Sequence, residues 1–158
     1  MKLIEVSHDK CVGCRLCEFV CSLVHEDECS TSKSRIRIHR DEEFGNNLVS
    51  VCSQCEEAHC IDSCALGALS RDEKTGAVVM DNSLCNGCEA CLVACPVGAT
   101  FLDRDKELAF RCDLCGGDPE CVKWCSRMAI TLADTDITSP ARKSFMAETA
   151  KLLAGLTS

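Results

Sequence analysis

The sequence predicts an α+β fold of short β-hairpins and short helices, followed by one C-terminal helix. Two observations predict it. Aromatic residues make up only 4% of the 158 residues, with no tyrosine and one tryptophan, so side-chain packing alone would give a thin core. Cysteine, in contrast, supplies 17 residues, far above its ordinary usage. We therefore expect a group bound by cysteines to hold the short elements together, in one compact domain or two small ones.

The strands are expected as short apolar segments between the cysteine-rich loops. Asp72-Glu73-Lys74-Thr75-Gly76 is a hairpin turn by composition, and it joins the best defined of the strand pairs. The first and last strands would pair and bring the two ends of the chain together. Only single-turn helices are expected between the strands. The strand pairs are residues 2–6 with 128–132, 35–40 with 48–51, 66–70 with 77–80, and 100–102 with 108–111.

Sixteen of the seventeen cysteines fall into four blocks, and only Cys29 stands outside them. Blocks one and three share one spacing, whereas blocks two and four share a longer version of it. This alternation indicates a tandem duplication of a two-block unit. In order, the blocks are Cys11, Cys14, Cys17, Cys21; Cys52, Cys55, Cys60, Cys64; Cys85, Cys88, Cys91, Cys95; and Cys112, Cys115, Cys121, Cys125.

The spacing of each block is typical of 4Fe-4S ligands, because three thiolates in one tight loop can bind three corners of a cubane while a fourth comes from elsewhere. Zinc bound by paired cysteines would leave Cys17 and Cys91 without a role. Disulfides are disfavoured by the odd cysteine count and by an N-terminus without an export signal. The sequence thus predicts four 4Fe-4S clusters, and a zinc-stabilised interaction module is the remote alternative.

At these residues the sequence resembles the four-cluster ferredoxin-like subunits that serve molybdenum and tungsten oxidoreductases. The resemblance extends over about residues 1–132, and it is greatest to the small subunits accompanying tungsten aldehyde oxidoreductases. Iron-sulfur subunits of formate dehydrogenase, hydrogenase and carbon monoxide dehydrogenase are also similar. Ala65 and Ser126 replace the proline that often follows the last cysteine of a block. The resemblance is carried by residues 11–18, 34–38, 52–56 and 111–117.

We expect two interleaved units of the bacterial ferredoxin type, each with two 4Fe-4S clusters. The gap between Cys64 and Cys85 holds one complete hairpin, which is the usual connection between the halves of such a unit. Blocks two and three would then form an inner unit, residues 52–95, and blocks one and four an outer unit, residues 1–51 and 96–137. Residues 138–158 would be a C-terminal helical tail. Pairing block one with two and block three with four is the alternative.

In two-cluster ferredoxins the last cysteine of each block binds the partner block's cluster, and the resembling family shares this crossed pattern. In this chain the crossed pattern would give each cluster three cysteines from one block and the last cysteine of the paired block. The predicted ligand sets are Cys11, Cys14, Cys17 and Cys125; Cys112, Cys115, Cys121 and Cys21; Cys52, Cys55, Cys60 and Cys95; and Cys85, Cys88, Cys91 and Cys64.

A cubane with four cysteine ligands has no open iron site, so the predicted function is the relay of single electrons without catalysis. The chain would be a non-catalytic electron-transfer subunit of an oxidoreductase complex. The resemblance implies a tungsten aldehyde oxidoreductase as catalytic partner, with formate dehydrogenase, hydrogenase or carbon monoxide dehydrogenase as alternatives. A flavin subunit or a ferredoxin would be the second redox partner. Glu18, Glu56 and Glu89, beside the blocks, predict low reduction potentials.

Charge and hydropathy exclude two classes of partner. The net charge of −8 would repel the phosphates of nucleic acids. No apolar segment approaches the roughly 18 residues that a membrane span needs, which argues against direct membrane insertion. Without an export signal, the expected location is the cytoplasm.

The C-terminal tail shows apolar residues at helical spacing after Ser139-Pro140, a plausible helix start. This stripe would either fold back onto the domain or bind another subunit, including a second copy of the chain. Its members are Phe145, Met146, Thr149, Leu152, Leu153 and Leu156.

Overall fold

The computed structural model describes residues 2–40, 45, 47–134, 146–147, 149–151 and 154. Within these residues the strands form four separate two-stranded antiparallel sheets. All four expected pairings are confirmed, including the one that joins the two ends of the chain. The pairs are β1 (Lys2–Val6) with β8 (Ile130–Asp134), β2 (Ile36–Arg40) with β3 (Asn47–Val51), β4 (Leu69–Arg71) with β5 (Val78–Met80), and β6 (Thr100–Asp103) with β7 (Leu108–Arg111).

β2 and β5 begin one residue later than the sequence predicts, at Ile36 and Val78. β4 and β8 begin two or more residues later, and left-handed backbone explains these two differences. β4 was expected from residue 66, but Gly67 has a φ of +64°. β8 was expected from residue 128, but Met128 has a φ of 49°. Neither value is compatible with an extended strand, so each strand starts beyond that residue, at Leu69 and at Ile130.

The prediction of single-turn helices is correct for three α-helices and wrong for the first. α1 (Leu16–Glu26) has 11 residues. The chain after Cys21 contains neither Pro nor Gly before the helix ends at Asp27, so nothing stops it after one turn. By contrast, Pro96 and Gly98 follow Cys95, and Gly67 follows Cys64. The short helices are α2 (His59–Asp62), α3 (Ala90–Val93) and α4 (Glu120–Lys123), with 3-10 turns η1 (His8–Lys10), η2 (Thr31–Lys33) and η3 (Leu114–Gly117).

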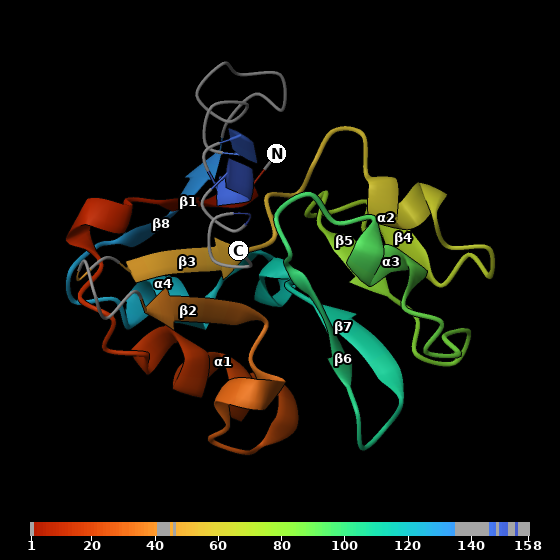
Figure 1. Cartoon of the computed structure of the whole chain (residues 1–158), viewed down its shortest axis with the longest axis horizontal. Helices are drawn as coiled ribbons and strands as arrows, with labels where there is room; N and C mark the ends of the chain where they lie inside the picture. Colours follow the sequence, from red (N-terminus) through yellow and green to blue (C-terminus); the bar gives the residue numbers. More distant parts are fainter. Residues whose placement is uncertain are drawn as a thin grey trace.

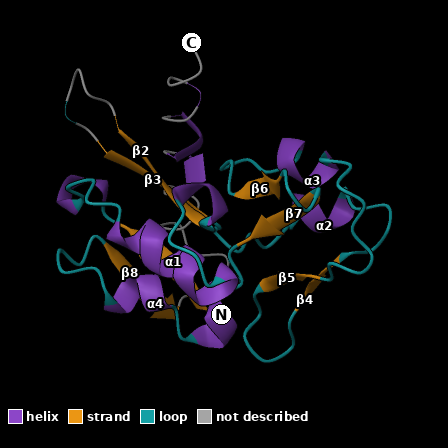
Figure 2. Cartoon of the chain, turned by 90° about the horizontal axis from the view of Figure 1, so that it is seen from below, coloured by secondary structure: helices purple, strands orange, loops and turns teal. Residues whose placement is uncertain are grey.

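The elements gather in two groups on either side of the hairpin β6–β7 (Figure 1). On one side α1 packs against α4, near the sheets β1–β8 and β2–β3. On the other side α2 packs against α3, near β4–β5. The view from below shows the same division (Figure 2). Elements from the two ends of the described chain therefore share one side, and the middle of the chain forms the other.

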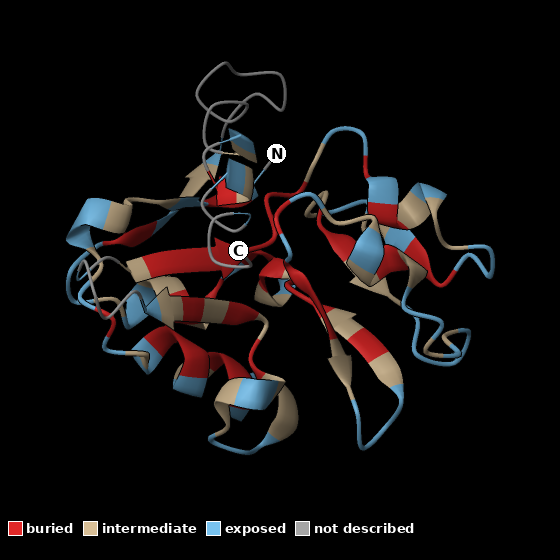
Figure 3. Cartoon of the chain, viewed as in Figure 1, coloured by how far each residue is buried: buried red, intermediate tan, exposed pale blue. Residues whose placement is uncertain are grey.

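Buried residues occur in both groups of elements (Figure 3), and they form two sets that both contain cysteines. In the larger set, aliphatic residues such as Ile4, Ile36 and Val49 pack with cysteines of blocks one, two and four. In the smaller set, Leu69 and Val78 pack with Cys60 and Cys91. The cysteines are thus structural members of both cores.

Two of the described tail residues, Met146 and Thr149, lie against the rest of the chain. Met146 packs against the larger buried set, and Thr149 is fully buried. Both side chains therefore pack within the chain itself. The expected helix start at Ser139-Pro140, together with Phe145, Leu152, Leu153 and Leu156, lies outside the described residues, so self-association through this stripe stays a prediction. In the part of the chain that the structure describes, no helix is long and apolar enough to cross a membrane.

Candidate iron-sulfur cluster sites

The four cysteine blocks share one local design, a tight loop that runs into a helix carrying the third cysteine. Cys17, Cys60, Cys91 and Cys121 lie in α1, α2, α3 and α4 respectively. In block one, Gly13 and Arg15 have positive φ, and Gly87 and Glu89 at the equivalent positions of block three do too. The same backbone geometry at equivalent positions agrees with the duplication inferred from the spacing.

Backbone N–H groups point at the last cysteine of every block. Ala99 N lies 3.2 Å from Cys95 Sγ, and Ala129 N lies 3.3 Å from Cys125 Sγ, in each case four residues further on. For Cys64, burial opposes the effect, but the N–H groups of residues 66–69 outweigh it and lower the pKa of the thiol. Cys21 accepts from Arg35 N at 3.3 Å. Such donors stabilise a thiolate and are usual around cluster ligands.

At one end of the molecule, Cys11, Cys14, Cys17 and Cys125 line a common, mostly apolar cavity. Burial raises the pKa of Cys11, and the nearby thiolates of Cys14 and Cys125 add to the increase. Burial also raises the pKa of Cys17, to about 12, with Glu18, Cys11 and Cys14 contributing. The structure thus brings Cys125 of block four to the first three cysteines of block one.

At the other end, Cys64, Cys85, Cys88 and Cys91 line a second apolar cavity. Burial raises the pKa of Cys91 to about 11, and the thiolates of Cys85, Cys60 and Cys88 contribute. Here the last cysteine of block two meets the first three of block three. The two end groups contain the exposed cysteines of the blocks, Cys14 and Cys88.

Between the ends, Cys21 meets the cysteines of block four. Burial raises the pKa of Cys121 strongly, and Cys21, Cys115 and Cys17 add to it. Burial likewise raises the pKa of Cys112, with Cys52, Cys121 and Cys21 contributing. Cys21 of block one thus lies near Cys112, Cys115 and Cys121 of block four.

The remaining set is centred on Cys52 and Cys60, whose Sγ atoms share one donor. Arg111 Nη1 lies 2.5 Å from Cys60 Sγ, and Arg111 Nη2 lies 2.5 Å from Cys52 Sγ. Cys95 packs in the same buried set as Cys52. Cys55 is half-buried in the loop that leads to α2, and its carbonyl accepts a hydrogen bond from Arg71.

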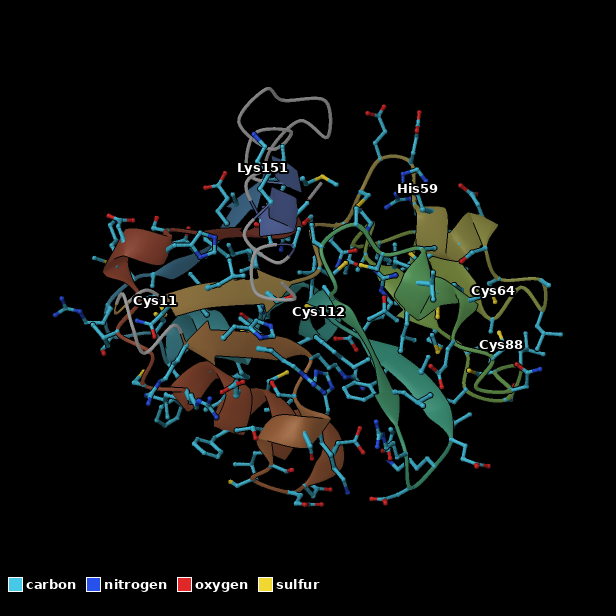
Figure 4. All side chains as sticks on the ribbon, viewed as in Figure 1. Cys11, His59, Cys64, Cys88, Cys112 and Lys151 are labelled. Atoms are coloured by element: carbon cyan, nitrogen blue, oxygen red, sulfur yellow. The ribbon has the colours of Figure 1, made fainter. Side chains whose placement is uncertain are left out.

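Neighbouring sulfurs link the four sets in a row. The charge of a nearby thiolate raises the pKa of a cysteine in the next set along the row. Cys17 acts in this way on Cys121, Cys52 on Cys112, and Cys60 on Cys91. Figure 4 shows Cys11 on one side, Cys112 in the middle, and Cys64 and Cys88 on the far side. The order is therefore the set with Cys11, then the set with Cys112, then the set with Cys52, and last the set with Cys88.

The donor chemistry of these sites fits 4Fe-4S clusters. Each set consists of thiols, most of them shielded from solvent, and the described donors around them include backbone N–H groups aimed at sulfur. Buried thiols with raised pKa values stay protonated unless a metal replaces the proton. His25, Asp113 and Cys115 also converge, with their ligand atoms within 4.8 Å of one another, but Cys115 already belongs to the second set.

Two residues near the sites carry roles that the sequence analysis did not assign. Gln54 is fully buried, donates to Cys112 O at 3.1 Å and accepts from Val78 N at 2.9 Å. Arg111 ends β7 at an inward-facing position, two residues after the buried Ala109. The sequence of β7 gives no signal for this position, because Leu108, Ala109 and Phe110 are all apolar and show no alternation that would place Arg111 inside.

Groups of four clustered thiols on a scaffold of short hairpins define an iron-sulfur protein of the ferredoxin type. Comparison with known families agrees: the family described as "4Fe-4S dicluster domain" matches residues 44–135, and the chain belongs to it.

Named relatives point the same way. The chain is 46% identical over 123 residues to the polyferredoxin-like subunit of aliphatic sulfonate oxidoreductase from Pyrococcus furiosus, covering 77% of this chain and 70% of that one. It is 33% identical over 156 residues to the electron transport protein HydN of Escherichia coli (strain K12), covering 84% and 88%. Among solved structures, the active site complex BamBC of benzoyl coenzyme A reductase contains a chain with a TM-score of 0.54, 26% identity and coverage of 98% and 91%.

The expectation of a ferredoxin-like electron-transfer subunit with 4Fe-4S clusters is thereby confirmed. The relatives are named as electron-transport or electron-transfer proteins and not as catalytic subunits.

Proposed function

We propose that this chain binds four 4Fe-4S clusters and relays single electrons along them, between a catalytic oxidoreductase subunit and a second redox partner. Each cluster of this kind accepts and releases one electron. The ligand sets are the four groups of sulfurs described above, with the last cysteine of each block exchanged between blocks one and four and between blocks two and three. The row of neighbouring sulfurs from Cys11 to Cys88 is the observation that carries the proposal.

The crossed pairing corresponds to two interleaved ferredoxin-type units. Its support is that Cys125 lines the cavity of block one and Cys64 that of block three. The alternative pairing of block one with block two would require the last cysteine of block two beside Cys11, where Cys125 lies instead. The outer unit combines residues 1–51 and 96–137, and the inner unit comprises residues 52–95.

The two ends of the row are suited to contact partners. Val12 and Leu16 line the first cavity with the exposed Cys14 and are 55% and 38% exposed, and Leu66 lines the second cavity with the exposed Cys88 and is 48% exposed. Exposed apolar side chains around an accessible ligand favour close approach of a partner protein. We propose that the catalytic subunit binds at one of these ends and the second redox partner, a flavin subunit or a ferredoxin, at the other.

The identity of the catalytic subunit rests on resemblance. We propose a tungsten aldehyde oxidoreductase, with a formate dehydrogenase, hydrogenase or carbon monoxide dehydrogenase as the alternative, all in the cytoplasm. The relative from Pyrococcus furiosus is a subunit of an aliphatic sulfonate oxidoreductase, and the structural neighbour comes from an active site complex. Both names thus describe parts of redox-enzyme assemblies.

Two measurements test the proposal. Anaerobic reconstitution followed by iron, sulfide and zinc analysis should give about sixteen irons per chain, four for each cubane; a folded protein with zinc in place of iron would contradict it. Anaerobic purification of the chain from its native source should then yield a larger redox protein, whose tungsten or molybdenum content identifies its class. A partner without either metal would refute the tungsten assignment and leave the electron relay intact.

A further inference from the structure

Arg111 places a guanidinium inside the protein, against the sulfurs of one proposed cluster. The residue is only 4% exposed, and its two terminal nitrogens lie on Cys60 Sγ and Cys52 Sγ at 2.5 Å each. Both sulfurs belong to the third set in the row, which is flanked by proposed clusters on both sides. The guanidinium therefore sits at an interior position of the relay.

The anionic partners that the structure shows for this cation are cysteine sulfurs. The terminal nitrogens of Arg111 donate to the Sγ atoms of Cys60 and Cys52. Among the described residues, no Asp or Glu lies within ion-pair distance of Arg111. The nearby carboxylate of Asp113 is paired with Arg35 at 2.7 Å. A buried cation needs a negative partner, and here the ligand sulfurs provide it.

The last cysteines of the blocks accept weaker, neutral hydrogen bonds from backbone N–H groups. Examples are Arg35 N to Cys21 and Ala129 N to Cys125. Hydrogen bonds from a charged donor are roughly twice as strong as neutral ones. Adding an electron to a cluster increases its negative charge, so a fixed cation with two donors on its ligands stabilises the reduced form more than the oxidised form.

We propose that Arg111 gives the cluster held by Cys52, Cys55, Cys60 and Cys95 the highest reduction potential of the four, so that the first electron to enter the chain resides there. This inference rests on the proposed function. It modifies the general expectation of low potentials at one site, because a buried cation opposes the acidic residues beside the blocks.

The test is a potentiometric titration of the reconstituted holoprotein, followed by low-temperature electron paramagnetic resonance. Arg111→Gln removes the charge and keeps one amide donor, whereas Arg111→Lys keeps the charge with a single ammonium. Arg37→Gln is the control, because Arg37 is a half-buried arginine that stacks on Phe101, 4.0 Å from the ring centroid, and donates to Ser32 O instead of to a cysteine sulfur. Iron content is measured for every variant.

In Arg111→Gln we expect the equilibrium constant for reduction of the highest-potential cluster to fall at least about tenfold. The midpoint potential of that step would then fall by at least about 59 mV, the value for one electron. The loss should be smaller in Arg111→Lys, and no step should move this far in Arg37→Gln. Unchanged steps in Arg111→Gln at full iron content would overturn the inference. If Arg111→Gln loses one cluster, the highest-potential step should be missing from its titration. A titration that still shows this step would also overturn the inference. A wild-type protein with far fewer than about sixteen irons would refute the proposed function instead.

Discussion

Gly87 is the position where one added methyl group should do most damage to a cluster loop. It lies between Cys85 and Cys88 with a φ of +69°, and a Cβ atom there would come 2.2 Å from the carbonyl oxygen of Glu107. Glu107 belongs to the turn between β6 and β7. The backbone of this turn cannot yield as a flexible side chain would. Gly87→Ala should therefore disturb both the loop of block three and its contact with the β6–β7 hairpin.

Two costs add in this variant. A non-glycine residue in the left-handed conformation costs about 1–2 kcal/mol, and forcing an extra methyl group into occupied space costs about 1–3 kcal/mol. Gly67→Ala is the matched control, because Gly67 has a φ of +64° with nothing within 4 Å of its added Cβ. It should bear only the first cost. The difference between the variants, about 1–3 kcal/mol, isolates the collision with Glu107.

The assay compares how fast the visible absorbance of the clusters is lost in denaturant under anaerobic conditions, since cluster loss makes unfolding irreversible. If the collision is fully relieved before the transition state, Gly87→Ala should lose its clusters about 5- to 160-fold faster than Gly67→Ala. Iron analysis beforehand verifies that both variants start fully loaded. Equal rates for the two variants would show that the turn at Glu107 yields freely, and the steric reasoning would be wrong.

Three further predictions concern ligands, packing and metal. Cys125→Ser should alter the same paramagnetic signal as Cys17→Ser, whereas Cys29→Ser should keep all the iron because Cys29 is exposed outside the four sets; separate signals for Cys125 and Cys17 would favour the alternative block pairing. Gln54→Ala should destabilise the folded protein by about 1–3 kcal/mol for each of the two buried groups it leaves unpaired, Cys112 O and Val78 N. The same anaerobic assay should show faster loss of cluster absorbance, and an unchanged rate would count against this bridging role. Chelation of iron should abolish most of the far-ultraviolet circular dichroism, because cysteines form part of both buried sets, and a chain that keeps its spectrum would show that packing alone suffices.

Three of the four strand pairings were predictable because their causes are local, whereas the pairing of β1 with β8 was expected from the pairing of blocks one and four. The turn at residues 72–76 sets one hairpin, and the cysteine spacing sets the loops. The length of α1 was missed because only the absence of a helix-stopping residue after Cys21 indicates it. The burial of Arg111 and the ion pair between Arg35 and Asp113 were missed because they join residues far apart in the chain. Spacing shows which residues can be ligands, whereas the fold decides which of them meet.

The pairing of β1 with β8 has a consequence for biosynthesis. Cys11 and Cys125 line one cavity although they stand near opposite ends of the described chain. A nascent chain exposes every ligand of the proposed inner unit once Cys95 has left the ribosome, but the first cysteines must wait for Cys125. Iron delivered during translation would therefore load the middle of the protein first. Joining such distant segments through a metal removes much of the conformational entropy of the unfolded chain. The last clusters inserted would therefore also stabilise the fold of the whole polypeptide.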